Sequence, residues 1–274
     1  MKNKIVILDF DGTLTLADEE AKPFLINFKK DIANLLNKTN IDKEWGKAER
    51  EILQNPNKYG WKYKGKIVAP PNADDYILAT VIAKFLLDEA GVLMNTNERD
   101  DILQQIYQRN YSKSGIAFKK GAKEVLEELI FKIPVFIVTN SRPDTVINKI
   151  EKLNPQGKEK IKIFGEAQKY FIDSSFDAVP ETMMINGLKR VIFLRRKKYF
   201  DVLNQIWKTT LIKPEQTLVI GDIFELDLAL PAILGCNVFL VANSNTPSCE
   251  KEAVSHLFKG YVSEDIKDIL KVIN

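Results

Sequence analysis

Three short apolar runs, each ending in a polar turn, constrain the fold of this chain more than any other feature. They are IVILDFDGT (5–13), PVFIVTNSR (134–142) and TLVIGDIFE (217–225). Continuous runs rich in β-branched residues are typical of strands buried inside a parallel sheet. NVFLVANS (237–244) is a fourth run of this kind, and YVSEDIKDILKVI (261–273) predicts a last short strand with a closing helix.

Amphipathic segments separate these runs. AKEVLEELI (122–130) places its apolar residues on one helical face, and YFDVLNQIWKT (199–209) does the same. Strands and helices that alternate in this way predict an α/β fold with a doubly wound parallel sheet. IKIFGEAQKYFID (161–173) suggests an extra strand or hairpin, to which no role can be assigned.

Residues 16–115 break the alternation. They contain three helical stretches without a convincing strand, DEEAKPFLINFKKDIANLLNK (18–38), DDYILATVIAKFLLDEAG (74–91) and ERDDILQQIYQRN (98–110). The segment 55–72 is rich in Pro, Gly and Asn and is interpreted as a loop. We therefore expect an α/β core formed by 1–15 and 116–274, with a helical domain over 16–115.

Composition excludes several classes of function. A net charge of +3 is too small and too dispersed for a typical nucleic-acid-binding protein. A single histidine, His256, excludes metal sites built from several histidines. No apolar run is long enough for a membrane span, and the first residues do not have the pattern of a signal peptide. The two cysteines lack the C-x-x-C spacing of a redox or metal-binding motif. We expect a cytoplasmic protein without membrane or nucleic-acid partners; its oligomeric state is not indicated.

Polar side chains follow the predicted strands at the points where they end. Asp9 and Asp11 follow the first run and, two residues apart, point the same way. Thr139 follows the second, and Asp222 the third. The carboxyl ends of parallel strands meet at one edge of the sheet, where ligands bind. Clustered carboxylates repel one another unless a cation compensates, and oxygen ligands without His or Cys favour Mg²⁺.

The motifs DFDGT, VTNS and GDIFELD, in this order, resemble those of the haloacid dehalogenase superfamily, in its phosphatase-like branch with a helical cap. The resemblance implies that Asp9 attacks phosphorus and forms an aspartyl-phosphate, while Asp11 serves as the acid and base. It implies that the Thr139 hydroxyl and the Asn140 N–H bind the phosphoryl oxygens. The domain at 16–115 would be the cap.

The same resemblance implies a magnesium site. Its ligands would be the Asp9 and Asp222 carboxylates and the main-chain carbonyl of Asp11, with Asp227 acting through water. It also implies a cation between the second and third motifs, for which RRKK (195–198) is the candidate. Lys197 is favoured as the catalytic cation, with Arg196 as a bidentate phosphate ligand, although the usual K-P-x-P pattern is missing.

Together these features predict a magnesium-dependent phosphohydrolase that cleaves a small phosphate monoester, a phosphorylated metabolite. An acid at Asp11 favours ester cleavage, because an alkoxide leaving group needs a proton and a halide does not. A phosphomutase of the same family is the alternative. A phospho-receiver domain or a non-catalytic binding module fits the motif order and the intact carboxylates less well.

Overall fold

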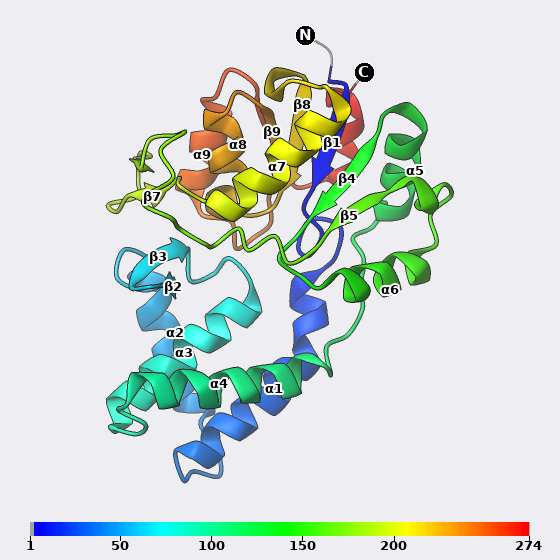
Figure 1. Ribbon diagram of the computed structural model, residues 1–274. Helices are drawn as coiled ribbons and strands as arrows, with labels where there is room; N and C mark the ends of the chain where they lie inside the picture. Colours follow the sequence, from blue (N-terminus) through cyan, green and yellow to red (C-terminus); the bar gives the residue numbers. More distant parts are fainter. Residues whose placement is uncertain (1–2, 274) are drawn as a thin grey trace. The chain divides into compact units, whose positions relative to one another are not determined.

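The computed structural model describes residues 3–273, and these contain a six-stranded parallel sheet in the order β10-β9-β8-β1-β4-β5 (Figure 1). The predicted α/β class and parallel sheet are confirmed. The strands are β1 (Ile5–Leu8), β4 (Val135–Val138), β5 (Lys162–Phe164), β8 (Thr217–Gly221), β9 (Asn237–Val241) and β10 (Gly260–Ser263).

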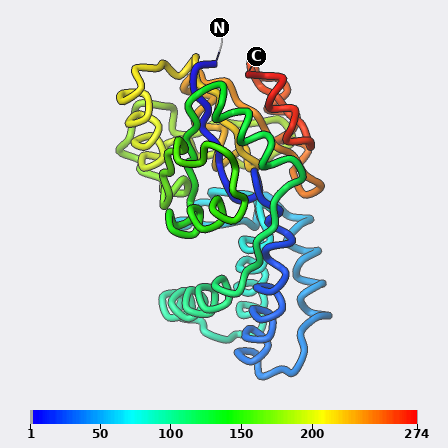
Figure 2. Tube along the Cα trace, turned by 90° about the vertical axis from the view of Figure 1, so that its right-hand side faces the viewer, coloured from blue at the N-terminus to red at the C-terminus, as the bar shows by residue number. Residues whose placement is uncertain are grey.

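Helices cover both faces of this sheet. Side chains alternate along a strand, so Ile5 and Ile7 of β1 face one layer, and Val6 and Leu8 face the other. The first layer holds α7 (Lys197–Thr210), α8 (Ala229–Ile233) and α9 (Ser248–Ser255). The second holds α5 (Ala122–Lys132), α6 (Pro143–Leu153) and α10 (Ile269–Val272). Figure 2 shows α5 in green and α10 in red, side by side.

The strand order decides where the functional residues lie. β1 pairs with β8 on one side and β4 on the other, with Ile7 opposite both Val219 and Phe136. Because all three strands are parallel, their carboxyl ends lie at one edge of the sheet. That edge therefore receives the residues that follow Leu8, Val138 and Gly221.

An irregular stretch connects β5 to α7. The expected extra strand in 161–173 is present as β5, at the edge of the sheet. After it the chain forms a short antiparallel pair, β6 (Thr182–Met183) with β7 (Ile192–Phe193).

Short helical turns lie elsewhere in the chain, at η1 (Lys158–Lys160), η2 (Pro214–Gln216), η3 (Phe224–Leu228, π-helical) and η4 (Ile266–Asp268).

Residues from Ala17 to Ala117 form a separate compact unit, and the rest of the chain forms the other. All of these residues are described, and they contain α1 (Ala17–Leu35), α2 (Asp42–Gln54), α3 (Asp75–Ala90) and α4 (Thr96–Tyr111). The sequence predicted a domain over 16–115, so the unit begins one residue later and ends two residues later than expected.

Two expectations for this unit were wrong. The segment 55–72 is not only a loop, because β2 (Trp61–Tyr63) and β3 (Lys66–Ala69) form an antiparallel hairpin around a turn at Lys64 and Gly65. A fourth helix, α2, was also missed. Its sequence is highly charged and contains Gly46, so its apolar pattern is hard to recognise. Only a short stripe of Trp45, Ala48 and Ile52 is buried in this helix.

None of the helices in the described part of the chain combines the length and the apolar character that crossing a membrane requires.

Candidate active site

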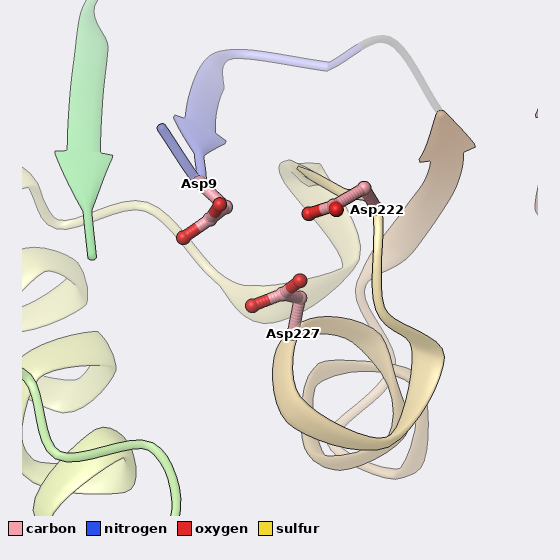
Figure 3. Close-up of side chains that lie close together, drawn as sticks. All are labelled: Asp9, Asp222 and Asp227. Carbon is pink, nitrogen blue, oxygen red and sulfur yellow. The ribbon is translucent and has the colours of Figure 1, made fainter. Parts of the chain in front are cut away.

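Three buried carboxylates converge at the carboxyl edge of the sheet. Asp9 follows β1, Asp222 follows β8, and Asp227 lies on the π-helical turn η3 (Figure 3). Each contributes one carboxylate oxygen to a group whose members all lie within 4.8 Å of one another. The sequence expectation that Asp9 and Asp222 meet agrees with this geometry, and Asp227 belongs to the same cluster.

The turn after β1 is built to let Asp222 approach. Gly12 has a φ of +76°, and a Cβ added there would lie 2.1 Å from Asp222 Oδ2. Only glycine satisfies both conditions, because it tolerates positive φ and has no Cβ. Thr13 Oγ1 lies 3.3 Å from Asp222 Oδ1 and 3.4 Å from Asp9 Oδ2, so its single proton can serve either carboxylate.

The cation of this cluster is Lys169. Its side chain is 1% exposed, and its ammonium donates to Asp9 Oδ1 and to Asp227 Oδ1, each at 2.7 Å. Burial alone would lower the pKa of Lys169, but Asp227 and Asp9 together raise it above its ordinary value. Burial, opposed by the Lys169 ammonium and reinforced by Asp227, raises the pKa of the Asp9 carboxyl to about 7.

Lys197, the cation favoured from the sequence, does not lie in the cluster. It opens α7, and its ammonium binds both carboxylate oxygens of Asp201 at 2.6 Å, one helical turn further on. This pair is partly exposed. The sequence predicted that the cation of the site lies in the basic run 195–198, whereas the ammonium that binds the carboxylate cluster belongs to the irregular segment after β5.

Arg196 is fully buried behind the cluster. Its Nη1 donates to the main-chain oxygen of Lys169 at 2.8 Å, and its Nε donates to that of Phe193 at 3.0 Å. Burial lowers the pKa of Arg196 to about 10, so it stays charged at neutral pH. The expected role as a phosphate ligand does not match these contacts, which instead support the loop that carries Lys169.

Thr139 and Asn140 lie at the end of β4, as expected. Thr139 is buried, and its hydroxyl oxygen accepts a hydrogen bond from the Ser141 N–H at 3.1 Å. The side-chain oxygen of Asn140 accepts from the main-chain N–H of Lys169 at 2.8 Å. Asn140 therefore contributes to the position of Lys169, a contact that the sequence did not suggest.

Asp11 lies beside the buried cluster and is partly exposed. Its Oδ2 accepts from Ser141 Oγ at 2.6 Å, and its Oδ1 accepts from Lys149 Nζ at 2.8 Å. Lys149 belongs to α6, and the sequence analysis did not identify it as a site residue. A sequence signal did exist, because Lys149 occupies a position on the buried face of an amphipathic helix.

A scan against protein families matches a model described as haloacid dehalogenase-like hydrolase over residues 3–235. The chain belongs to this family and is a hydrolase of its kind, as the resemblance in the sequence motifs predicted. No sequence among the curated proteins matches it.

Solved structures share the fold. A predicted phosphoglycolate phosphatase from Haemophilus somnus has a TM-score of 0.58 at 14% identity, over 100% of this chain and 99% of that one. The HAD-hydrolase YfnB from Bacillus subtilis, described as bound to magnesium, has a TM-score of 0.56 at 14% identity, over 100% of both chains. A haloacid dehalogenase-like hydrolase from Streptococcus pneumoniae has 0.55 at 16% identity, over 99% of both. At these identities the likeness concerns the fold alone.

The donor set suits a hard divalent cation. Three carboxylates lie close together in a buried region, and the Lys169 ammonium binds two of them, Asp9 and Asp227. Carboxylates buried this close together repel one another, and a bound cation would offset that repulsion. All three offer oxygen, the ligand atom that Mg²⁺ prefers. Asp9, Asp222 and Asp227 are the residues that could hold such an ion.

Proposed function

We propose that this hydrolase is a phosphatase that cleaves a small phosphate monoester through a phosphorylated Asp9. The proposal rests on two aspartates that lie two residues apart in different environments. Asp9 is buried and binds Lys169, whereas Asp11 is partly exposed and binds Lys149. These environments suit two different roles, a nucleophile that is held in place and an acid that is open to the leaving group.

Asp9 is the proposed nucleophile. Lys169 binds its Oδ1 and leaves Oδ2, near the Thr13 hydroxyl, as the oxygen to attack phosphorus. The ammonium would also reduce the repulsion between a carboxylate and an anionic phosphate. In the attack, the bond from Asp9 to phosphorus forms as the bond to the ester oxygen breaks. Water then hydrolyses the aspartyl-phosphate.

Asp11 is the proposed acid and base. It would give its proton to the departing ester oxygen and later take one from the attacking water. Cleavage of a carbon–halogen bond needs no such proton, so a carboxyl group at this position favours esters. Thr139 and the Asn140 N–H, at the end of the adjacent strand β4, would bind the phosphoryl oxygens.

Mg²⁺ is the proposed cofactor, with the Asp9, Asp222 and Asp227 carboxylates and the Asp11 carbonyl as the residues that would hold it. When bound, it would offset the charge of the phosphate and stabilise the transition state. We further propose that the unit from Ala17 to Ala117 serves as the cap that selects the substrate, a phosphorylated metabolite of the cytoplasm.

Hydrolysis of p-nitrophenyl phosphate with and without Mg²⁺ tests the proposal. We expect turnover that requires Mg²⁺ and that Asp9→Asn abolishes, with the thermal unfolding temperature of the variant recorded to show that it is folded. Asp11→Asn should lose less activity with this substrate, because nitrophenolate leaves without a proton. Turnover that survives Asp9→Asn would contradict the proposal, and so would a folded, magnesium-supplied wild type that cleaves no phosphate ester.

A further inference from the structure

The buried face of α6 contains a lysine where an apolar residue is expected. Val146, Ile150 and Leu153 form an i, i+4, i+7 stripe that packs on the sheet, and Lys149 lies within this stripe. The side chain of Lys149 is 8% exposed. Ile147 on the same helix is 47% exposed, so the helix buries a cation while it leaves an apolar side chain in water.

The buried ammonium points to Asp11. Lys149 Nζ lies 2.8 Å from Asp11 Oδ1, and it also lies over the ring of Phe10, 5.8 Å from the ring centre. Ser141 Oγ binds the other oxygen, Oδ2, at 2.6 Å. Both carboxylate oxygens of Asp11 thereby accept a hydrogen bond, although its side chain is 29% exposed.

Stability does not explain this arrangement well. Burial of an ammonium costs desolvation energy, and an apolar side chain of similar volume commonly packs in such a place without loss. Because the Asp11 side chain is partly exposed, water could hydrate its carboxylate if the Lys149 ammonium were removed. The fold would therefore tolerate a methionine at residue 149, so the lysine points to a role outside stability.

We propose that Lys149 is a positioning residue for Asp11. Its ammonium holds Oδ1 of Asp11 at the end of β1. The acid form of Asp11 carries its proton on Oδ2, and this proton passes to the leaving oxygen as the ester bond breaks. The proposal rests on the proposed phosphatase function, and it makes Lys149 important only for substrates whose leaving group needs that proton.

Two aryl phosphates of similar size test this role. Phenol is a much weaker acid than p-nitrophenol, so phenyl phosphate depends on the acid and p-nitrophenyl phosphate depends on it little. We expect Lys149→Met to lower kcat/KM for phenyl phosphate about 10- to 100-fold. The loss for p-nitrophenyl phosphate should stay below about 3-fold, since proton transfer contributes little there. The unfolding temperature should fall by no more than about 2 °C.

Lys152→Met is the matched control, because Lys152 is an exposed lysine on the same helix. It should leave both substrates unchanged. Lys149→Arg should restore part of the lost activity. In an Asp11→Asn background, Lys149→Met should cause no further loss, because its effect acts through Asp11.

An equal loss for both substrates, or no loss, would overturn the role of Lys149. So would a further loss in the Asp11→Asn background. If Lys149→Met does not fold, Ser141→Ala removes the other contact of Asp11 and must show the same selective loss for phenyl phosphate; without it the proposal fails. These results are distinct from failure of the proposed function, which would appear as turnover independent of Asp9 or as an inactive wild type.

Discussion

Arg196 Nη1 donates a 2.8 Å hydrogen bond to the main-chain oxygen of Lys169, the lysine whose ammonium joins Asp9 to Asp227. One helical turn further on, the Tyr199 hydroxyl donates to the main-chain oxygen of Asp227 at 2.9 Å. The start of α7 thus holds the backbones of Lys169 and Asp227, which form an ion pair beside Asp9. A basic residue at this helix start, Arg196, binds the backbone of the site, and the cation in contact with Asp9, the proposed nucleophile, comes from the loop after β5.

Lys169→Met should lower the rate of p-nitrophenyl phosphate hydrolysis by about 100-fold or more, because Asp9 loses the positive charge that orients its carboxylate. The variant should also unfold at a lower temperature, since the buried carboxylates Asp9 and Asp227 lose the ammonium that both of them bind. Lys197→Met is the matched control. Its ammonium pairs with Asp201 on a partly exposed helix face, so rates and unfolding temperature should stay near those of the wild type. The opposite ranking in steady-state assays would return the role to Lys197.

Gly12→Ala should remove the metal-dependent activity, because its Cβ would collide with the Asp222 carboxylate. Gly65→Ala separates this collision from backbone strain. Gly65 has the same φ of +76° but nothing within 4 Å of an added Cβ. We expect Gly65→Ala to cost only the strain, about 1 kcal/mol of unfolding free energy, with normal activity. Urea unfolding and p-nitrophenyl phosphate assays of both variants measure the difference; equal effects would show that contact with Asp222 is unimportant.

The residues that sequence reasoning located are those that end strands. Asp9 and Asp222 could be placed because a parallel strand fixes where its carboxyl end lies and which way alternate side chains point. Lys169 could not be placed, because the segment after β5 has no periodicity, and its position depends on Asn140 and Arg196 from distant elements. Lys149 was missed for a different reason, since a lysine on an amphipathic helix is normally solvated.

Glu250 on α9 should make stability depend on pH. It is buried, its Oε2 accepts from the Phe224 N–H at 3.1 Å, and its Oε1 has no partner among the described residues. Burial, together with the nearby Glu225 carboxylate, raises the pKa of Glu250 to about 8.

The raised pKa means that folding favours the protonated form. Its stabilising contribution is complete below the unfolded-state pKa of about 4.5 and is lost as pH rises through about 8. The slope approaches about 1.4 kcal/mol per pH unit between these values. Glu250→Gln should flatten this part of the stability curve, measured by urea unfolding across pH. Glu252→Gln, an exposed change on the same helix, should not, and a curve unchanged by Glu250→Gln would contradict the assignment.

Binding of Mg²⁺ should release a proton from Asp9. Because the pKa of the metal-free Asp9 carboxyl is raised to about 7, the ion must displace a proton at lower pH. Apparent affinity should therefore increase about 5-fold from about pH 6 to about pH 7, about 10-fold from about pH 6 to about pH 8, and level off above that. Calorimetry in buffers of different ionisation enthalpy measures the released proton. Asp9→Asn should abolish the release, and release unaffected by this change would place the proton elsewhere.

Phosphorylation of Asp9 is the step on which the proposed function depends, and peptide mass spectrometry of the acid-quenched enzyme detects it. After brief reaction with acetyl phosphate and Mg²⁺, we expect one phosphoryl group on the peptide that contains Asp9, and none in the Asp9→Asn variant. Asp11→Asn, which keeps the nucleophile but slows hydrolysis of the intermediate, should retain the label longer. A phosphoryl group found on another residue, or turnover with no covalent label in any variant, would contradict the account.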